Sequence, residues 1–440
     1  MRRRTFAGGM AAIALVITVL GPGVQSVDAR GVRPASFGPH GHDVRFATFN
    51  VSLNRTAEGE LVANLAEPYD GSDPFAPGAS NETLRRWQAA NVAEVIQLQR
   101  PDVLLLNEFD YDAAGTAIDS FRTNYLAVSQ NGAEPIDYPY VFVAPSNTGI
   151  PSGFDLNNDG TIGGGDDAFG FGAYPGQYGM AVLSKYPIIE PFARTFQTFR
   201  WADMPGNQIP AGFYDDAERA ALRLSSKSHW DVPIRIGWRT VHLLASHPTP
   251  PVFDGAEDRN GRRNHDEIRF WADYVSPAKS RYIYDDKFAA RQWGGRRGGL
   301  VPGATFVIAG DQNADPNDGD STDDAIHQLL DSFWVADPAP TSAGGVEAAA
   351  QGGANAAHVG DPAQDTADFN DAIGASGNLR VDYVLPSRHL RVNGTGVFWP
   401  TLDDPASRLT GVFNFAQFVR DGIGFPTSDH RMVWLDVRVR

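Results

Sequence analysis

Asp311 and Asn313 are the residues whose types and spacing first suggest chemistry. They follow an apolar run from Phe306 to Ala309, which is typical of a buried strand in an α/β sheet, and Gly310 breaks that run. Such sheets bind ligands at the carboxyl ends of their strands. A carboxylate and a carboxamide held there can orient a water molecule and stabilise a developing oxyanion, as phosphoester hydrolysis requires. The alternative is a turn capped by the two side chains.

Polar residues occupy the same position at two strand ends in the N-terminal half. The alternating run 44–51 predicts a first strand with Asn50 near its end, and the apolar run 103–106 predicts a second strand that leads to Glu108. A helix predicted between them completes a βαβ-like unit. The alternative role for Asn50 is to cap a turn, and the alternative for Glu108 is an exposed, solvated carboxylate without a function. Directly after buried positions, Glu108 is a metal-ligand candidate.

The C-terminal half adds two imidazoles and two more carboxylates. His247 follows another predicted apolar strand, although a satisfied structural histidine is the alternative. Asp382 stands inside the strand predicted over Leu379–Pro386, where a buried charge needs a partner. The adjacent pair Asp429 and His430 precedes the last predicted strand. We expect these side chains to share one edge with Asp311.

Composition limits the classes of protein that the chain can represent. Its 440 residues permit one large domain or two medium ones, and 42% apolar residues exclude disorder of the whole chain. The absence of cysteine excludes disulfides and thiolate metal sites. The net charge of −16 opposes a broad surface that tracks phosphates, because nucleic-acid affinity comes largely from Lys and Arg.

The N-terminus resembles an export signal over residues 1–29. A basic start precedes the apolar run 6–20, which is short for a membrane span, and small residues offer cleavage after Ala29. Twin-arginine export and ordinary secretion both fit, and a retained anchor is the alternative. Cleavage would remove three arginines and one aspartate, which takes the net charge from −16 to −18. We expect a secreted bacterial-type protein with a flexible leader over 30–43 and one domain over 44–440.

An insertion over 145–178, rich in Gly, Pro, Asn and Asp, contains a stretch with the spacing of a Ca²⁺ loop. The predicted ligands, at loop positions 1, 3, 5, 7 and 12, are Asp155, Asn157, Asp159, Thr161 and Asp166. An aspartate replaces the usual glutamate at position 12 and no clear helix flanks the loop, so a solvated turn is the alternative. We expect a structural Ca²⁺ that holds the insertion near the site.

Three residues are predicted to contact substrate. Tyr178 lies in a Gly/aromatic segment that resembles a mobile lip, where its hydroxyl could donate to a phosphate or its ring could simply pack. Arg262 and Arg263 belong to a basic turn that opens an amphipathic helix over 259–275. They could engage an anionic substrate, with a salt-bridge network at the helix start as the alternative.

Two further segments are expected to have simple structures. Residues 221–225 predict a short strand. The Ala/Gly stretch 343–358 has little apolar bulk and predicts a surface loop.

The ordered landmarks of the chain resemble those of the endonuclease/exonuclease/phosphatase superfamily, from about residue 44 to 440. They are F-N at 49–50, N-E at 107–108, G-M-A-V-L-S-K-Y-P-I at 179–188, S-H-P at 246–248, G-D-Q-N at 310–313, V-D-Y-V at 381–384 and S-D-H at 428–430. The resemblance implies a four-layer α/β sandwich, with two mixed β-sheets packed face to face, helices outside and an active site at one edge of the sheets.

The resemblance also implies a role for each residue. Asn50, Glu108 and Asp429 would hold a divalent cation, and ligands of oxygen and nitrogen suit Mg²⁺ or Mn²⁺. The implied catalytic residues are His247, Asp311, Asn313, Asp382 and His430. Among them, Asp311 would orient or deprotonate the water and Asn313 would steady the phosphoryl oxygens. His430, its tautomer fixed by Asp382, would touch the scissile phosphate, and His247 would be a second imidazole.

The resulting hypothesis is an exported, divalent-metal-dependent phosphoesterase that hydrolyses phosphate mono- or diesters. The W-C-D-R element of inositol-phosphate phosphatases is missing, so the substrate stays open between a small molecule and nucleic acid. We expect a monomer without stable membrane insertion after processing. The alternatives are an extracellular nuclease and a non-catalytic Ca²⁺-dependent binding module on the same fold.

Overall fold

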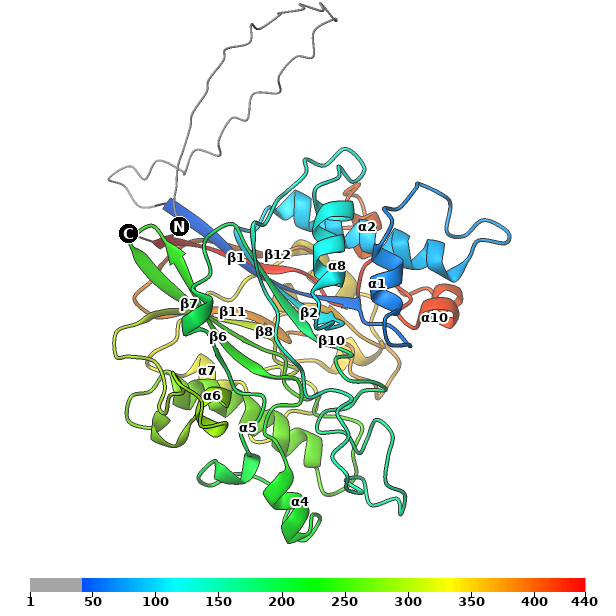
Figure 1. Cartoon of the computed structure of the whole chain (residues 1–440). Helices are drawn as coiled ribbons and strands as arrows, with labels where there is room; N and C mark the ends of the chain where they lie inside the picture. The colour runs from blue at the N-terminus through cyan, green and yellow to red at the C-terminus, as the bar shows by residue number, and fades with distance from the viewer. Residues whose placement is uncertain (1–41, 440) are drawn as a thin grey trace, which may run out of the picture. The chain divides into compact units, whose positions relative to one another are not determined.

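Two β-sheets pack face to face, and helices cover the outer face of each (Figure 1). The computed structural model describes residues 42–439. The export signal predicted over 1–29 and most of the leader predicted over 30–43 therefore lie outside the described residues. The expected four-layer sandwich of two mixed sheets is confirmed.

The first sheet has six strands in the order β12-β13-β1-β2-β4-β3. In that order their bounds are Arg391–Val397, Val433–Val439, His42–Leu53, Val103–Phe109, Met180–Ser184 and Tyr140–Phe142. Its one parallel pair is β1 with β2, and the register aligns Asn50 with Asn107. The other pairs are antiparallel.

The second sheet has five strands in the order β11-β8-β7-β6-β5. In that order their bounds are Asp382–Pro386, Thr305–Asp311, Arg239–Ser246, His229–Ile236 and Arg194–Thr195. Its one parallel pair is β7 with β8. The antiparallel pair β8–β11 places Asp382 directly opposite Asp311. A separate short pair joins β9, Ala367–Asp368, to β10, Asn378–Leu379.

The helices divide between the two outer faces. Those that share a core with the first sheet are α1 (Glu60–Leu65), α2 (Asn81–Gln99), α3 (Thr116–Phe121) and α9 (Ser407–Thr410). Those on the side of the second sheet are α4 (Asp216–Ala221), α5 (Arg259–Tyr274), α6 (Asp286–Ala289) and α7 (His327–Leu330). Two further helices are α8 (Ala343–Ala349) and α10 (Phe415–Asp421). The start and end of α2 follow local rules, because Ser80 accepts from the Thr83 amide and Arg100 turns left-handed before Pro101.

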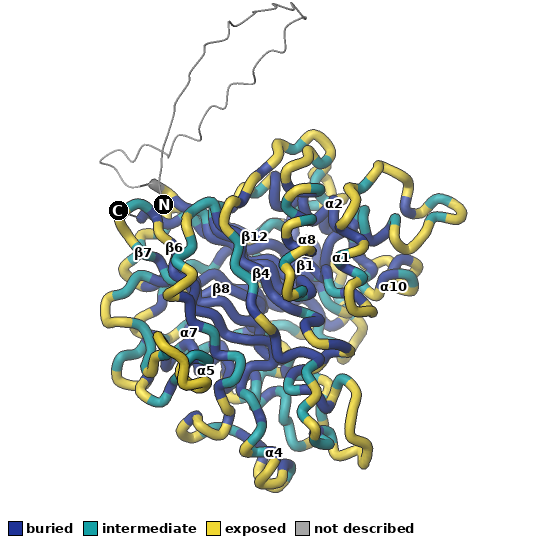
Figure 2. Tube along the Cα trace, viewed as in Figure 1, coloured by how far each residue is buried: buried dark blue, intermediate teal, exposed yellow. Residues whose placement is uncertain are grey.

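Alternation along the strands builds three apolar cores. On β2, Val103 and Leu105 enter the core between the sheets, whereas Leu104 and Leu106 face the helices of the first sheet. β1 and β8 alternate in the same way. The central strands are consequently buried on both faces, and exposure is concentrated in the connecting loops (Figure 2).

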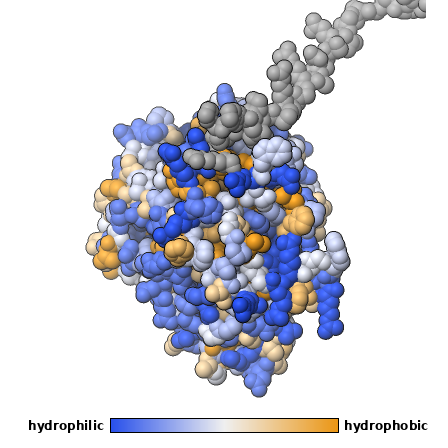
Figure 3. Space-filling view, turned by 90° about the vertical axis from the view of Figure 1, so that its left-hand side faces the viewer, coloured by the Kyte–Doolittle hydropathy of each residue, from blue (hydrophilic) through white to orange (hydrophobic). Residues whose placement is uncertain are grey.

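Apolar side chains are gathered mainly in these cores. The face shown in Figure 3 is largely hydrophilic, with apolar residues in small scattered groups. Within residues 42–439, no helix is both long and apolar enough to cross a bilayer.

The prediction of a strand over 221–225 is wrong. α4 ends at Ala221, and the four residues after it make only an isolated bridge, through Arg223 to Arg200. The reason is a capping box that fixes the helix, in which Asp215 accepts from the Glu218 amide and Glu218 accepts from the Asp215 amide.

The prediction of a surface loop over 343–358 is also wrong, because α8 and a 3₁₀ turn form within this stretch. Ser342 caps α8 by accepting from the Gly345 amide. At Gly344 an added Cβ would lie 2.3 Å from the carbonyl oxygen of Trp399. The small residues of this stretch therefore allow its backbone to pack closely against the neighbouring chain, although they lack apolar bulk.

We predict that Gly310→Ala destabilises the fold. Gly310 has φ of 143°, and an added Cβ would lie 1.9 Å from the Ser246 carbonyl oxygen on the neighbouring strand. Strain and overpacking together should lower the free energy of unfolding by about 3 kcal/mol or more. Gly206→Ala is the control, since φ is 64° there and nothing lies within 4 Å, and it should cost about 1 kcal/mol. Equal effects in urea unfolding would contradict the steric argument.

We also predict a pH-dependent stability from Asp365. Burial, then the charges of Asp315, Asp318 and Asp361, raise the pKa of Asp365 to about 8. Between its unfolded pKa of about 3.8 and about 8, the folded state keeps a proton that the unfolded chain has released, so stability falls as the pH rises.

Asp365→Asn should therefore stabilise the protein by at least about 2 kcal/mol at pH 9 and by less than about 0.5 kcal/mol at pH 3. Glu134→Gln, at an exposed position, is the control. Urea unfolding across this pH range measures both variants, and parallel curves for Asp365→Asn and the parent chain would refute the prediction.

Candidate functional site

A pocket of about 1580 Å³ lies beside the carboxyl ends of the two parallel strand pairs. Six of the eight residues with a predicted catalytic or metal role line it: Glu108, His247, Asp311, Asn313, Asp429 and His430. Asn50 and Asp382 lie behind them and hydrogen-bond to the lining residues. The structure thus brings together all eight residues to which the resemblance assigned catalytic or metal roles.

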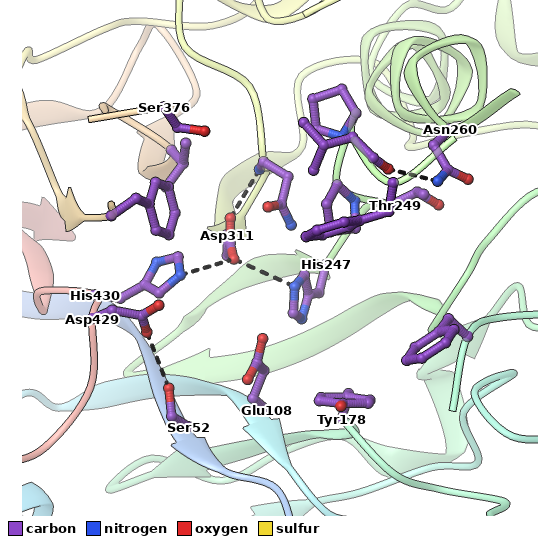
Figure 4. A pocket seen from close by; sticks show the side chains of 18 of the residues that line it. Ser52, Glu108, Tyr178, His247, Thr249, Asn260, Asp311, Ser376, Asp429 and His430 are labelled. Atoms are coloured by element: carbon purple, nitrogen blue, oxygen red, sulfur yellow. Dashed lines mark hydrogen bonds and ion pairs between the residues drawn. The ribbon is translucent and has the colours of Figure 1, made fainter. Parts of the chain in front are cut away.

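Asp311 is at the centre of this arrangement (Figure 4). Its Oδ2 accepts from Asn50 Nδ2 at 3.1 Å and lies 3.4 Å from His247 Nε2 and 3.7 Å from His430 Nε2. Its Oδ1 accepts from the Asn313 amide at 2.8 Å. Burial raises the pKa of Asp311 to about 7, the His430 charge opposes that rise and the Asp382 charge adds to it. A carboxylate so placed can orient a water molecule and accept its proton near neutral pH.

His430 is held by Asp382, whose Oδ2 accepts from His430 Nδ1 at 2.9 Å and from Thr366 Oγ1 at the same distance. Burial alone would lower the pKa of His430, but the carboxylates of Asp382 and Asp311 raise it well above its ordinary value. These carboxylates therefore favour the imidazolium form of the ring, whose Nε2 lies 3.7 Å from Asp311 Oδ2.

The pKa of His247 is shifted in the opposite direction. Burial, with the Lys227 charge added, lowers the pKa of His247 well below its ordinary value. Its Nδ1 is buried and has no hydrogen-bond partner within residues 42–439. The surroundings of Asp311 therefore favour the charged form of one imidazole, His430, and the neutral form of the other, His247.

Lys227 is a functional candidate that the sequence analysis missed. It lines the pocket and is buried, and its Nζ donates to the Pro248 carbonyl at 3.4 Å. Burial lowers its pKa, whereas the charges of Glu267, Glu108 and Asp311 raise it. Its sequence context, between small polar residues before a strand, gives only a weak signal of this position.

Glu108 and Asp429 form the part of the pocket that fits a hard cation. Burial and then the Asp429 charge raise the pKa of Glu108. Both carboxylates line the pocket, and neither makes an ion pair with a basic residue in the described chain. Figure 4 shows Asp429 beside Ser52, whose Oγ donates to it at 3.3 Å, with Glu108 between Ser52 and His247. With the Asn50 amide oxygen, they offer the oxygen ligands that Mg²⁺ or Mn²⁺ prefers.

A second group also has metal-like spacing. One ligand atom each from Asp311, Asp382 and His430 lies within 4.8 Å of the others. The 2.9 Å hydrogen bond between Asp382 and His430 already engages two of these groups, and a positive charge on His430 would oppose a cation. The predicted cation therefore fits better on the side of Glu108.

One face of α5 holds the ends of β7 and β8 in place. Asn264 donates to the carbonyls of Thr249 and Gln312, Glu267 accepts from the amides of Ser226 and Thr249, and Trp271 donates to Ser246 Oγ. These three helix residues lie at i, i+3 and i+7, which places them on one face. The sequence analysis considered the arginines of this helix and overlooked this stripe.

The predicted substrate arginines have other contacts. Arg262 donates to the Glu257 carbonyl and does not line the pocket. Arg263 lines the pocket, but its Nε and Nη2 donate to main-chain carbonyls of Leu224, Phe169 and Arg223. The geometry favours the alternative of a network at the helix start for Arg262 and a structural role for Arg263.

Tyr178 borders the pocket, as expected for the lip. Its hydroxyl makes no hydrogen bond to a described residue, and burial raises its pKa to about 12. The Tyr178 amide donates to Asp110 Oδ1 at 3.0 Å, and its ring packs near Phe171. The hydroxyl remains a predicted donor to substrate.

The predicted Ca²⁺ loop lies next to the pocket, which Asp166 lines. Asp155 accepts from the amides of Asp159 and Gly160, and Asp159 accepts from the amide of Thr161 and the side chain of Asn157. Asp166 is exposed. The buried Asp167 closes the base of the loop instead by accepting from the amides of Leu156 and Gly163. Calcium binding stays a prediction.

Comparisons with solved structures find similar chains at low identity. An endonuclease/exonuclease/phosphatase from Beutenbergia cavernae is 17% identical over 90% of this chain and 72% of its own, with a TM-score of 0.44. Sphingomyelinase C from Streptomyces griseocarneus is 15% identical over 90% and 99%, with a TM-score of 0.41. TDP2 from Caenorhabditis elegans is 16% identical over 90% and 75%, with a TM-score of 0.39.

A comparison with curated proteins gives no match. The model of the endonuclease/exonuclease/phosphatase family matches residues 47–430, which is most of the chain. The two mixed sheets and the residues gathered around Asp311 agree with this match. The chain belongs to the endonuclease/exonuclease/phosphatase family.

Proposed function

We propose that this chain is an exported, divalent-metal-dependent hydrolase of phosphate mono- or diesters that acts as a monomer. The observation that carries the proposal is the buried Asp311 carboxylate, which lies within 3.7 Å of two imidazoles and beside the acidic pair Glu108 and Asp429. In-line displacement needs a positioned water, charge neutralisation and donors to the phosphoryl oxygens. This pocket offers groups for each of these tasks.

In the proposed reaction, Asp311 orients a water molecule and takes its proton while the water oxygen bonds to phosphorus. The ester P–O bond breaks, and His430 supplies a proton to the leaving oxygen. Asn313 and Lys227 stabilise the negative charge on the phosphoryl oxygens. A cation bound by Asn50, Glu108 and Asp429 would neutralise phosphate charge and polarise the P–O bond.

An extracellular nuclease is the second candidate, since nucleases share the family. The net charge of −16 favours a small phosphoester over a long polyanion. Purified chain starting at residue 30 should be tested on p-nitrophenyl phosphate, bis-p-nitrophenyl phosphate and plasmid DNA, each with Mg²⁺ and with chelator. We expect metal-dependent release of p-nitrophenol; cleavage of the plasmid alone would favour the nuclease.

We predict that Asp311→Asn lowers kcat/KM by at least about 10²-fold, because the amide keeps the shape but cannot accept the proton. Asp331→Asn, an exposed position on the far end of α7, is the control and should keep its activity. Steady-state kinetics with the hydrolysed ester measure both. Full activity of Asp311→Asn would leave the non-catalytic binding module as the better explanation.

We also predict that Lys227→Met lowers kcat/KM by about 10²-fold through loss of a buried positive charge that faces the reacting phosphate. Lys185→Met is the control, because Lys185 forms a partly exposed ion pair with Asp102 and does not line the pocket. Circular dichroism should show that both variants fold. An equal and small effect in both would remove Lys227 from the proposed reaction.

A further inference from the structure

Two arginines line the same pocket but take no part in the site described above. Arg55 lies two residues after β1, and Arg85 lies in the first half of α2. Their exposed fractions are only 1% and 6%. Burying a guanidinium is costly unless it is paired and hydrogen-bonded. Their partners therefore decide what they do.

Neither guanidinium is satisfied by the protein. Arg55 donates from Nε to Asn64 Oδ1 at 2.8 Å and from Nη1 to the Asn54 carbonyl at 3.0 Å, but its buried Nη2 has no partner. Arg85 makes no side-chain hydrogen bond and no ion pair with any described residue, and its Nη1 is fully buried. Two neighbouring arginines that line one pocket thus carry donor atoms without a partner among the described residues.

The three acidic groups that act on these arginines are Asp110, Asp421 and Glu60, and each already accepts other hydrogen bonds. Glu60 accepts from the Thr56 hydroxyl at 3.1 Å. Asp110 accepts from the amides of Arg55 and Tyr178 and from the Tyr174 hydroxyl. Asp421 accepts from Gln417 Nε2 and from the amides that follow it. Burial, followed by the charge of Arg85, lowers the pKa of Arg55 to about 9. The repulsion between the two arginines would be relieved by an anion from outside the chain.

The contacts of Asp110 link Arg55 to the surroundings of the proposed cation site. The Asp110 carboxylate that binds the Arg55 amide stands two residues after Glu108. The same carboxylate holds the amide of Tyr178, which borders Glu108 in Figure 4. An anion bound by Arg55 and Arg85 would therefore be within the same pocket as the phosphoester that reacts.

We propose that Arg55 and Arg85 form an anion subsite that binds a second phosphate group of the substrate, next to the phosphoester that is hydrolysed. This inference rests on the proposed function and narrows its substrate class to phosphoesters with at least two phosphates. Guanidinium groups suit this ligand because their planar donors match phosphate oxygens in pairs. A free phosphate ion has the same chemistry, so the experiment must separate the two sources.

The first test measures binding without turnover. In chelator, calorimetry with inorganic phosphate should show one site in the full exported chain, with at least tenfold weaker binding in Arg85→Met. Arg86→Met is the matched control, because Arg86 is the next residue of α2 and is paired with Glu82 at 2.7 Å. Asp311→Asn should keep the phosphate affinity. Unchanged binding in Arg85→Met, or loss of binding in Asp311→Asn, would overturn the subsite.

Stability gives a second readout that a purely structural arginine would not produce. Because Arg85 has no protein partner, Arg85→Met should raise the free energy of unfolding in phosphate-free buffer, and added phosphate should stabilise only the parent chain and the Arg86→Met control. A loss of stability in Arg85→Met without phosphate would show that Arg85 has a structural role and would refute the proposal.

The last test identifies the source of the anion. Rates are compared for p-nitrophenyl thymidine 5′-phosphate with and without a 3′-phosphate, and Arg85→Met should reduce the preference for the doubly phosphorylated ester at least tenfold. An unchanged preference, with phosphate binding lost, would assign the subsite to free phosphate and overturn the substrate proposal. If neither ester is hydrolysed by the parent chain, the proposed function fails, whereas calorimetry still decides the anion subsite.

Discussion

The buried carboxylate of Asp311 is the interaction on which the site depends, because it joins the two sheets. It belongs to the second sheet and accepts a hydrogen bond from Asn50 of the first. Asn107 adds a second link, since its Oδ1 accepts from the Asp311 amide and its Nδ2 donates to the Ser246 carbonyl. Removing such a charge from water is costly unless donors surround it. The relative position of the sheets and the chemistry of the pocket are therefore linked.

The part of the site that sequence alone predicts is the part fixed by strand ends. Apolar runs that stop at Glu108, His247 and Asp311 correctly placed those residues at one edge, because parallel pairs end on the same side. The pairing of Asp382 with His430 came only from the resemblance, and the register that sets Asp382 opposite Asp311 was not predicted. The amphipathic pattern of 259–275 likewise predicted α5 closely.

What sequence could not predict depends on partners that are distant along the chain. Two examples are the buried Lys227 and the stripe Asn264, Glu267 and Trp271. Their sequence surroundings are ordinary for a loop and a helix, and their roles appear only once the loops around β7 and β8 are folded. The different surroundings of Arg263 and Arg85 also depend on residues that are distant along the chain. Arg263 looks free in sequence but binds main-chain carbonyls, whereas Arg85 looks like a helix surface residue but is buried without a partner.

The position of Asp167 has a consequence for the insertion beside the pocket. This buried side chain accepts from the main-chain amides of Leu156 and Gly163 and so fixes both ends of the loop 156–163 without using the outer carboxylates. A calcium ion that bound to the outer carboxylates would therefore change the conformation of the loop little. The rim of the pocket would then keep its outline in calcium-poor and calcium-rich surroundings alike.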